Sequence, residues 1–140
     1  MDKRINIFTD GGARGNPGPA AIGVYVEDLE GKVLAEIGKT IGITTNNVAE
    51  YKAVIEALDW MVENQKTFPP NVRISFFLDS LLVCSQIKGI YRVKDANLKN
   101  LMILIREREA NINHPISYAH VPREQNKNAD RLVNHALDQV

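Results

Sequence analysis

The amino-acid sequence predicts an α/β fold in which helices pack on a mixed β-sheet. Short runs rich in β-branched and aromatic residues indicate five strands, and segments with apolar residues at helical spacing indicate four helices. Their order is three strands, a helix, a strand, two helices, a strand and a helix. Strands separated by helices can be joined by parallel crossovers, whereas short turns join antiparallel strands, so both kinds of pairing are expected.

The first three predicted strands form an antiparallel meander. Residues 5–9 are a β-branched and aromatic run that stops at Asp10, and residues 11–19 follow as an irregular turn rich in glycine and proline. Residues 20–26 and 33–41 are the next two strands. The connection between them has hairpin length and contains a glycine, which supports antiparallel pairing.

The rest of the chain alternates between helices and strands. Apolar side chains recur at helical spacing from Asn46 to about Asn64, and residues 68–71, with two prolines, end that helix. A strand over residues 72–78 runs directly into a second acid, Asp79. Two helices, a strand and a closing helix then follow over residues 81–87, 98–110, 116–121 and 125–137.

The amino-acid composition limits the classes of protein to which this chain can belong. The chain has 140 residues, 44% of them hydrophobic and 24% charged, which indicates one domain, residues 1–140, with a substantial core. Seventeen Lys and Arg balance seventeen Asp and Glu. This balance excludes a strongly basic nucleic-acid-binding domain, so contact with a polyanion must depend on a local patch or on metal ions.

The single cysteine, Cys84, excludes an intrachain disulfide and a cysteine-rich zinc site. The N-terminal residues lack the apolar core of a signal peptide, and no run approaches the length of a membrane span. We therefore expect a soluble, cytoplasmic protein without a membrane partner, and we expect it to be a monomer.

Four acids fall at positions where α/β proteins bind ligands. Asp10 and Asp79 follow predicted strands, Glu50 lies in the first turn of the long helix, and Asp130 lies near the start of the closing helix. Four carboxylates without matching cations repel one another unless metal ions neutralise them. Carboxylate oxygens suit Mg²⁺ or Mn²⁺, and two such ions can catalyse phosphodiester hydrolysis.

Each acid also has a structural interpretation. Asp10 and Asp79 could be turn residues, and Asp130 could lie on a solvated helix face. Glu50 stands three residues after Asn47 and could complete a capping box with it. The spacing of the acids does not decide between these interpretations and a metal site.

Five short motifs carry a family resemblance: FTDGG at residues 8–12, GNPGP at 15–19, TNNVAE at 45–50, LDS at 78–80 and NKNAD at 126–130. In this order they resemble the type 1 ribonuclease H family, and the resemblance extends from Ile5 to about Leu137. It implies a single ribonuclease H domain whose five-stranded sheet has three antiparallel strands followed by two parallel ones, with helices on both faces.

The resemblance also implies an activity and a metal site. Members of the family hydrolyse the RNA strand of RNA/DNA hybrids by a two-metal-ion mechanism and leave 5′-phosphate and 3′-hydroxyl ends. Asp10, Glu50, Asp79 and Asp130 would be the catalytic, metal-binding carboxylates, with two Mg²⁺ ions in the substrate complex and Mn²⁺ as a substitute. A noncatalytic nucleic-acid-binding module on the same fold is the alternative.

Substrate contacts follow from the same resemblance, which places them at seven residues around the acids: Gly11, Gly12, Ala13, Asn16, Thr45, Asn46 and Asn47. A 2′-hydroxyl distinguishes RNA from DNA, and neutral side chains of this kind suit sugar and phosphate oxygens. The family's loop histidine has no assigned equivalent here, so Arg123 and Glu124 are candidates for an auxiliary role.

Overall fold

In the computed structural model, which describes residues 3–140, one mixed sheet has the strand order β3-β2-β1-β4-β5. Strands β1 (Lys3–Ala13), β2 (Gly18–Asp28) and β3 (Val33–Thr44) are antiparallel neighbours. Strand β4 (Val72–Leu78) pairs with β1 in parallel, and β5 (Ile116–His120) pairs with β4 in parallel. The predicted fold class is therefore confirmed, while the first two residues of the predicted domain lie outside the described range.

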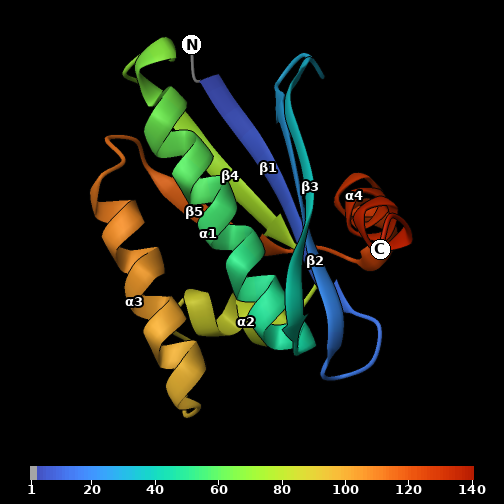
Figure 1. Ribbon diagram of the computed structural model, residues 1–140. Coiled ribbons are helices and arrows are strands. Elements are labelled where there is room, and N and C mark those ends of the chain that lie inside the picture. The colour runs from blue at the N-terminus through green and yellow to red at the C-terminus, as the bar shows by residue number, and fades with distance from the viewer. Residues whose placement is uncertain (1–2) are drawn as a thin grey trace.

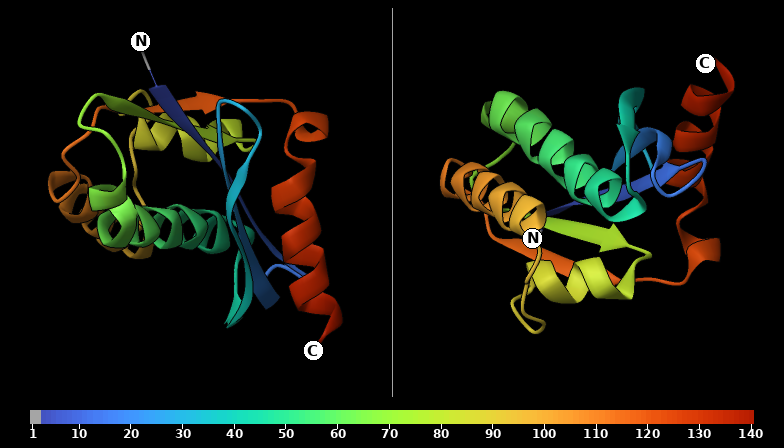
Figure 2. Two further views of the ribbon diagram at one scale, coloured as in Figure 1. Left: turned by 90° about the horizontal axis from the view of Figure 1, so that it is seen from above. Right: turned by 60° about the horizontal axis from the view of Figure 1, so that its bottom comes forward.

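Helices cover both faces of this sheet. Figure 1 and the left view of Figure 2 show the last helix, α4, on one side of the strands, and α1 with α3 on the other side. The α-helices are α1 (Asn46–Asn64), α2 (Leu81–Ile87), α3 (Ala96–Ala110) and α4 (Lys127–Asp138). Two short 3₁₀ helices, Gln65–Thr67 and Arg123–Gln125, follow α1 and precede α4.

The structure corrects the predicted end of the first strand. Asp10 does not follow β1 but lies within it, because β1 stays paired with β2 as far as Ala13. Its pairing with β4 ends earlier, at Thr9 opposite Leu78. Small residues on both strands allow the antiparallel ladder to continue, so the predicted irregular turn shrinks to residues 14–17.

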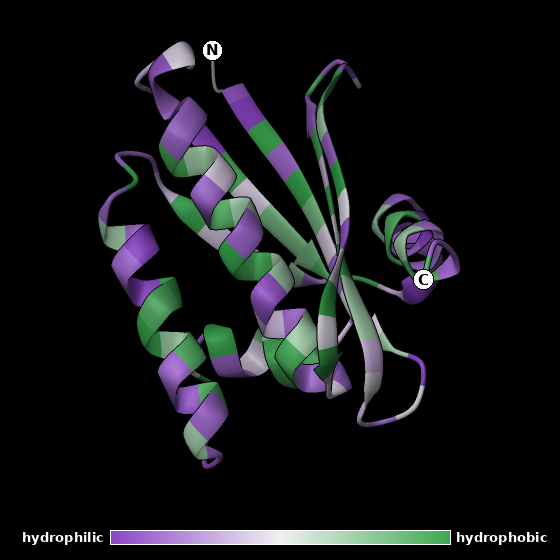
Figure 3. Cartoon of the chain, in the orientation of Figure 1, coloured by the Kyte–Doolittle hydropathy of each residue, from purple (hydrophilic) through white to green (hydrophobic). Residues whose placement is uncertain are grey.

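The main core lies between the sheet and α1. Buried aliphatic side chains of β1 and β4, such as Ile7 and Ile74, pack against Tyr51, Val54 and other fully buried residues of α1. Helix α1 carries both polar and apolar residues, as Figure 3 shows, and its buried apolar residues form the face that covers the sheet. Burial of this face fixes the rotation of α1 about its axis, and therefore the direction in which Glu50 points.

Glycines allow α4 to lie unusually close to the other face of the sheet. A Cβ atom on Gly23 of β2 would lie 2.2 Å from the carbonyl oxygen of Ala129, so only glycine fits there. Gly23 is directly opposite Asp10 in the antiparallel ladder, and Ala129 precedes Asp130. Close packing of α4 at this point therefore brings Asp130 toward the end of the sheet where Asp10 lies.

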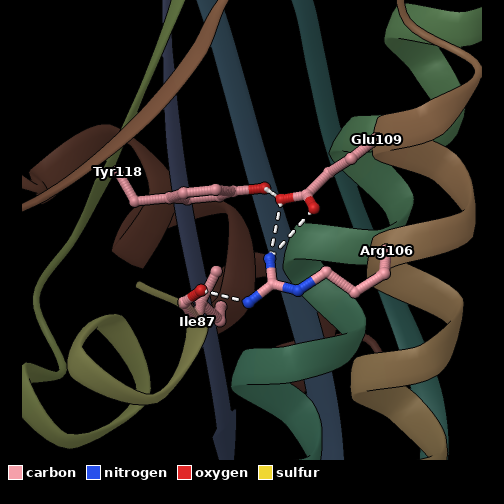
Figure 4. Close-up of polar contacts among 4 residues, drawn as sticks. All are labelled: Ile87, Arg106, Glu109 and Tyr118. Atoms are coloured by element: carbon pink, nitrogen blue, oxygen red, sulfur yellow. Dashed lines mark hydrogen bonds and ion pairs between the residues drawn. The ribbon is translucent and has the colours of Figure 1, made fainter. Parts of the chain in front are cut away.

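A polar cluster ties α3 to the remainder of the fold (Figure 4). The Tyr118 hydroxyl on β5 donates to Oε2 of Glu109 at 2.6 Å, and Arg106 forms an ion pair with Glu109 at 2.9 Å. Arg106 also donates to the carbonyl oxygen of Ile87, the last residue of α2. One cluster thus joins α2, α3 and β5.

None of the helices within residues 3–140 is both long and apolar enough to cross a membrane.

Candidate active site

Three carboxyl groups meet where the parallel strands β1 and β4 separate. Asp10 follows the last residue of β1 that pairs with β4, and Asp79 follows the last residue of β4. Asp10, Glu50 and Asp79 each offer one carboxylate oxygen, and these three oxygens all lie within 4.8 Å of one another. The crevice at the carboxyl ends of parallel strands therefore holds a cluster of oxygen ligands.

Glu50 enters the cluster from α1, and the close approach of α1 to Gly11 places it there. A Cβ atom on Gly11 would lie 2.2 Å from the carbonyl carbon of Ala49 and 2.5 Å from the backbone nitrogen of Glu50. Contacts of that length are not possible, so the backbone beside Asp10 can meet α1 only because residue 11 lacks a side chain. This gives Gly11 a packing role in addition to the predicted substrate contact.

The capping-box interpretation of Glu50 is wrong. The helix begins at Asn46, and its N-cap is Thr45, whose Oγ1 accepts a hydrogen bond from the backbone N–H of Val48 at 3.2 Å. Glu50 lies beyond the first turn, contrary to the sequence-based expectation, because the helix starts two residues earlier than a cap at Asn47 would require. The Glu50 side chain is therefore not needed to cap the helix.

Burial and mutual repulsion perturb the acids. Desolvation raises the pKa of Asp10 from its ordinary value of 3.8 to about 7, and the charge of Asp79 adds to the rise. Desolvation also raises the pKa of Glu50 well above its usual value of 4.5, with the charge of Asp10 as the second cause. A cation at this point would reverse both effects, because it favours the ionised carboxylates.

The donor set fits a divalent metal ion. Glu50 is 7% exposed, and its buried Oε2 has no hydrogen-bond partner within residues 3–140, which is costly for a carboxyl oxygen. An ion held by Asp10, Glu50 and Asp79 would supply the missing partner and offset the crowding of negative charge. The cluster thus has the chemistry of a hard-cation site.

Asp130 lies at the rim of the same site and not within the tight cluster. It lines the cavity that contains the other three acids, and its charge contributes to the raised pKa of Asp10. Its side chain is 33% exposed and lies 3.6 Å from the guanidinium of Arg123, which is 81% exposed. The structure therefore brings all four predicted acids to one cavity, and Asp130 is more exposed than the buried Asp10 and Glu50.

The predicted substrate contacts divide into two groups. Gly11, Gly12, Ala13 and Asn46 line the cavity beside the acids, as does the auxiliary candidate Arg123. The remaining predicted residues do not line it: Asn16, Thr45, Asn47 and Glu124. Thr45 caps α1, whereas Asn16, Asn47 and Glu124 are exposed.

Two asparagines hold the loop after β1 against the start of α1. The Asn46 Oδ1 accepts a hydrogen bond from the backbone N–H of Ala13 at 2.8 Å, and the Asn16 Oδ1 accepts one from the backbone N–H of Asn46 at 2.9 Å. Both side-chain oxygens are therefore used within the protein. The amide nitrogens are the ends of these side chains that can donate to a ligand.

Sequence reasoning missed three polar residues at the site, of which Asn126 contacts a predicted acid directly. Asn126 is buried, and its Nδ2 donates a hydrogen bond to Oδ2 of Asp79 at 3.1 Å. It stands just before α4, where an asparagine is an ordinary helix cap, so its type and position gave no signal of this contact. Arg14 and Asn134 also line the cavity and were not predicted.

Comparison with known proteins agrees with this geometry. The family model described as Reverse transcriptase-like matches residues 8–136. Ribonuclease HI of Halobacterium salinarum is 39% identical over 135 residues, covering 96% of this chain and 65% of its own length. A bifunctional protein of Mycobacterium tuberculosis is 40% identical over 136 residues, covering 96% of this chain and 36% of its own length. The chain thus spans between about a third and two thirds of these curated relatives.

A solved structure extends the likeness to three dimensions. LC11-RNase H1, crystallised in complex with an RNA/DNA hybrid, is 42% identical and superposes with a TM-score of 0.90 over 96% of this chain and 97% of its own. The sheet order and the carboxylate cluster define a ribonuclease H-like domain. With the matches in sequence, the chain belongs to the type 1 ribonuclease H family, as its motifs indicated.

Proposed function

We propose that this chain is an endonuclease that hydrolyses the RNA strand of RNA/DNA hybrids and leaves 5′-phosphate and 3′-hydroxyl ends. The observation that carries the proposal is that carboxylate oxygens of Asp10, Glu50 and Asp79 lie within 4.8 Å of one another, and that a buried Glu50 oxygen has no hydrogen-bond partner in the described part of the chain. Family membership supports it, because the solved relative LC11-RNase H1 was crystallised with an RNA/DNA hybrid. The ions are proposed to be two Mg²⁺, with Mn²⁺ as a substitute.

The carboxylates would hold the ions, with Asp10, Glu50 and Asp79 as the inner ligands and Asp130 at the rim of the cavity. Bound there, the ions would activate a water molecule and stabilise the leaving oxygen. Burial of Asp10 and Glu50 fixes their carboxyl groups before any ion binds, so little ordering is required. Arg123, beside Asp130, is placed to neutralise part of the charge at the solvent side of the cavity.

The backbone of Gly11, Gly12 and Ala13 lies along the wall of the cavity, where it can face the sugar of a bound strand. Asn16 and Asn46 present their amide N–H groups nearby, because their oxygens are bonded within the protein. We propose that these donors contact phosphate and sugar oxygens of the hybrid, together with Thr45 and Asn47. The cytoplasmic location and the monomeric state stay predictions.

The test is cleavage of a labelled RNA strand, either annealed to DNA or left single, with Mg²⁺, Mn²⁺ or EDTA. We expect cleavage of the hybrid alone, only with a divalent ion, and its loss by at least about a thousandfold in Asp10→Asn, because the substitution removes a charge from the metal site. Circular dichroism should show that this variant is folded. A folded wild-type protein that binds hybrid without cutting it would instead support the noncatalytic binding module.

A further inference from the structure

Asn126 lies at the junction of the segments that carry the acids. It is 1% exposed and occupies the N-cap position of α4, where its backbone carbonyl accepts a hydrogen bond from the N–H of Asp130 at 3.1 Å. An asparagine at this position ordinarily uses its side-chain oxygen to cap the helix. Here the side chain makes no capping hydrogen bond, so it serves another purpose.

The side-chain amide of Asn126 points to the metal site. Its Nδ2 donates to the backbone carbonyl of Thr9 at 2.9 Å and to Oδ2 of Asp79 at 3.1 Å. Both partners are acceptors, so the amide nitrogen and oxygen cannot be exchanged without losing both bonds. The two N–H groups of one amide thus join the residue before Asp10 to the Asp79 carboxylate.

These contacts reach two of the four acids directly and the chain neighbour of a third. The backbone of Asn126 bonds to that of Asp130, and its side chain bonds to Asp79 and to the residue that precedes Asp10. Asn126 Oδ1 is buried and has no hydrogen-bond partner among the described residues, so packing alone does not explain an asparagine here. A buried apolar side chain would avoid that cost but could not bond to Asp79.

We propose that Asn126 is a positioning residue of the metal site, which holds the Asp79 carboxylate in register with Asp10. This inference rests on the proposed function, because it assigns Asn126 a role toward the divalent ion. A hydrogen bond to an ionised carboxylate is stronger than one between neutral groups and fixes its orientation. Partners of this kind behind a ligand typically contribute about tenfold to a hundredfold to metal affinity.

The first experiment measures binding of Mn²⁺ and of Mg²⁺ by calorimetry, with no nucleic acid present. We expect Asn126→Ala to weaken binding by about tenfold or more relative to the wild type. Asn128→Ala is the matched control, because Asn128 is an exposed asparagine in the same turn of α4. The control should bind the ions as the wild type does. Equal affinity of wild type and Asn126→Ala would overturn the inference.

The second experiment separates positioning from a general loss of structure. If Asn126 acts through Asp79, then Asn126→Ala should weaken Mn²⁺ binding by less than about twofold when it is added to Asp79→Asn. An undiminished effect in that background would mean that Asn126 acts by another route, and would overturn the inference. Hybrid cleavage by Asn126→Ala should also recover toward the wild-type rate as the Mg²⁺ concentration is raised, whereas Asp79→Asn should not recover.

The design keeps the failure of this inference distinct from that of the proposed function. A wild-type protein that binds neither ion would contradict the proposed metal site and the role of Asn126 together. A wild type that binds the ions, with Asn126→Ala unchanged, would contradict the role of Asn126 alone. Should the alanine variant not fold, Asn126→Ser replaces it. Its hydroxyl has one hydrogen to donate where the amide donates two, so affinity should still fall, and unchanged affinity would again overturn the inference.

Discussion

At the scale of single residues, Asn46 combines two roles in one side chain. Its Oδ1 holds the backbone of Ala13, and its amide nitrogen is the end that remains to donate to a ligand at the cavity wall. Asparagine suits both roles because it carries an acceptor and a donor on the same planar group. Replacement by aspartate separates the roles, because aspartate retains an acceptor oxygen and loses the donor.

We predict that Asn46→Asp folds with near wild-type stability but raises the KM for hybrid cleavage by about tenfold or more, because a donor to the polyanion is replaced by a negative charge. Steady-state cleavage and thermal unfolding test this. Asn128→Asp introduces the same charge at an exposed position and should raise KM less. Equal KM values for the two variants would show that only net charge matters.

At the scale of elements, the contact between β1 and α1 depends on Gly11. A side chain there would meet the backbone of α1 at 2.2 Å, whereas a Cβ atom on the neighbouring Gly12 would meet only Val133 Cγ1 at 3.7 Å. The first contact requires α1 to move, and the second is an ordinary van der Waals contact. Two adjacent glycines of the same strand therefore differ sharply in what they permit.

Gly11→Ala should lower the free energy of unfolding by about 3 kcal/mol or more, because the backbone of α1 cannot relax as a side chain can. Gly12→Ala should change it by less than about 1 kcal/mol. Urea denaturation of both variants, with metal ions removed, measures the difference. Comparable stabilities would mean that α1 adjusts freely against β1, contrary to the packing seen here.

The second prediction at this scale concerns the polar cluster of Arg106, Glu109 and Tyr118. It joins α3 to β5 and to the end of α2, and burial together with the hydrogen bond to Glu109 raises the pKa of Tyr118, so its hydroxyl stays protonated and donates. Tyr118→Phe should cost about 1.5 to 3 kcal/mol, the usual contribution of a hydrogen bond to a charged group. Tyr91→Phe, at an exposed tyrosine, is the control for urea denaturation and should be nearly neutral.

At the scale of the whole molecule, the acids make the metal-free protein sensitive to pH. The pKa of Asp10 is about 7 in the folded state and near 3.8 when unfolded, so the folded state binds its proton more tightly. The resulting stability is present in full below about pH 4 and is lost as the pH rises through about 7. The raised pKa of Glu50 acts in the same direction.

We therefore expect the Tm of the wild type in EDTA to fall between about pH 5 and pH 8 more steeply than that of Asp10→Asn, which lacks this titration. Mg²⁺ should raise the wild-type Tm at about pH 8, because an ion that binds only the folded state stabilises it. Scanning calorimetry with and without Mg²⁺ provides both readings. Parallel Tm profiles for the two proteins in EDTA would contradict the account.

The sequence by itself determined which segments form helices and strands, the mixed sheet and the four acids that share one cavity. Periodicity is local, so α1 and α2 were placed at their observed bounds and β4 ends at Leu78 as predicted. The motifs around the acids could also be recognised from the sequence, because each lies within a few consecutive residues. Their assignment to a metal is still a proposal, although the geometry supports it.

Only the tertiary structure decided the features that depend on partners far along the chain. Pairing with β2 carries β1 past Asp10 to Ala13, and the approach of Ala49 makes Gly11 indispensable. Asn126 bonds to Asp79, 47 residues away, and to Thr9, 117 residues away. The physical reason is that residue type and spacing report local backbone preference, whereas these contacts arise only when packing of the core brings separate elements together.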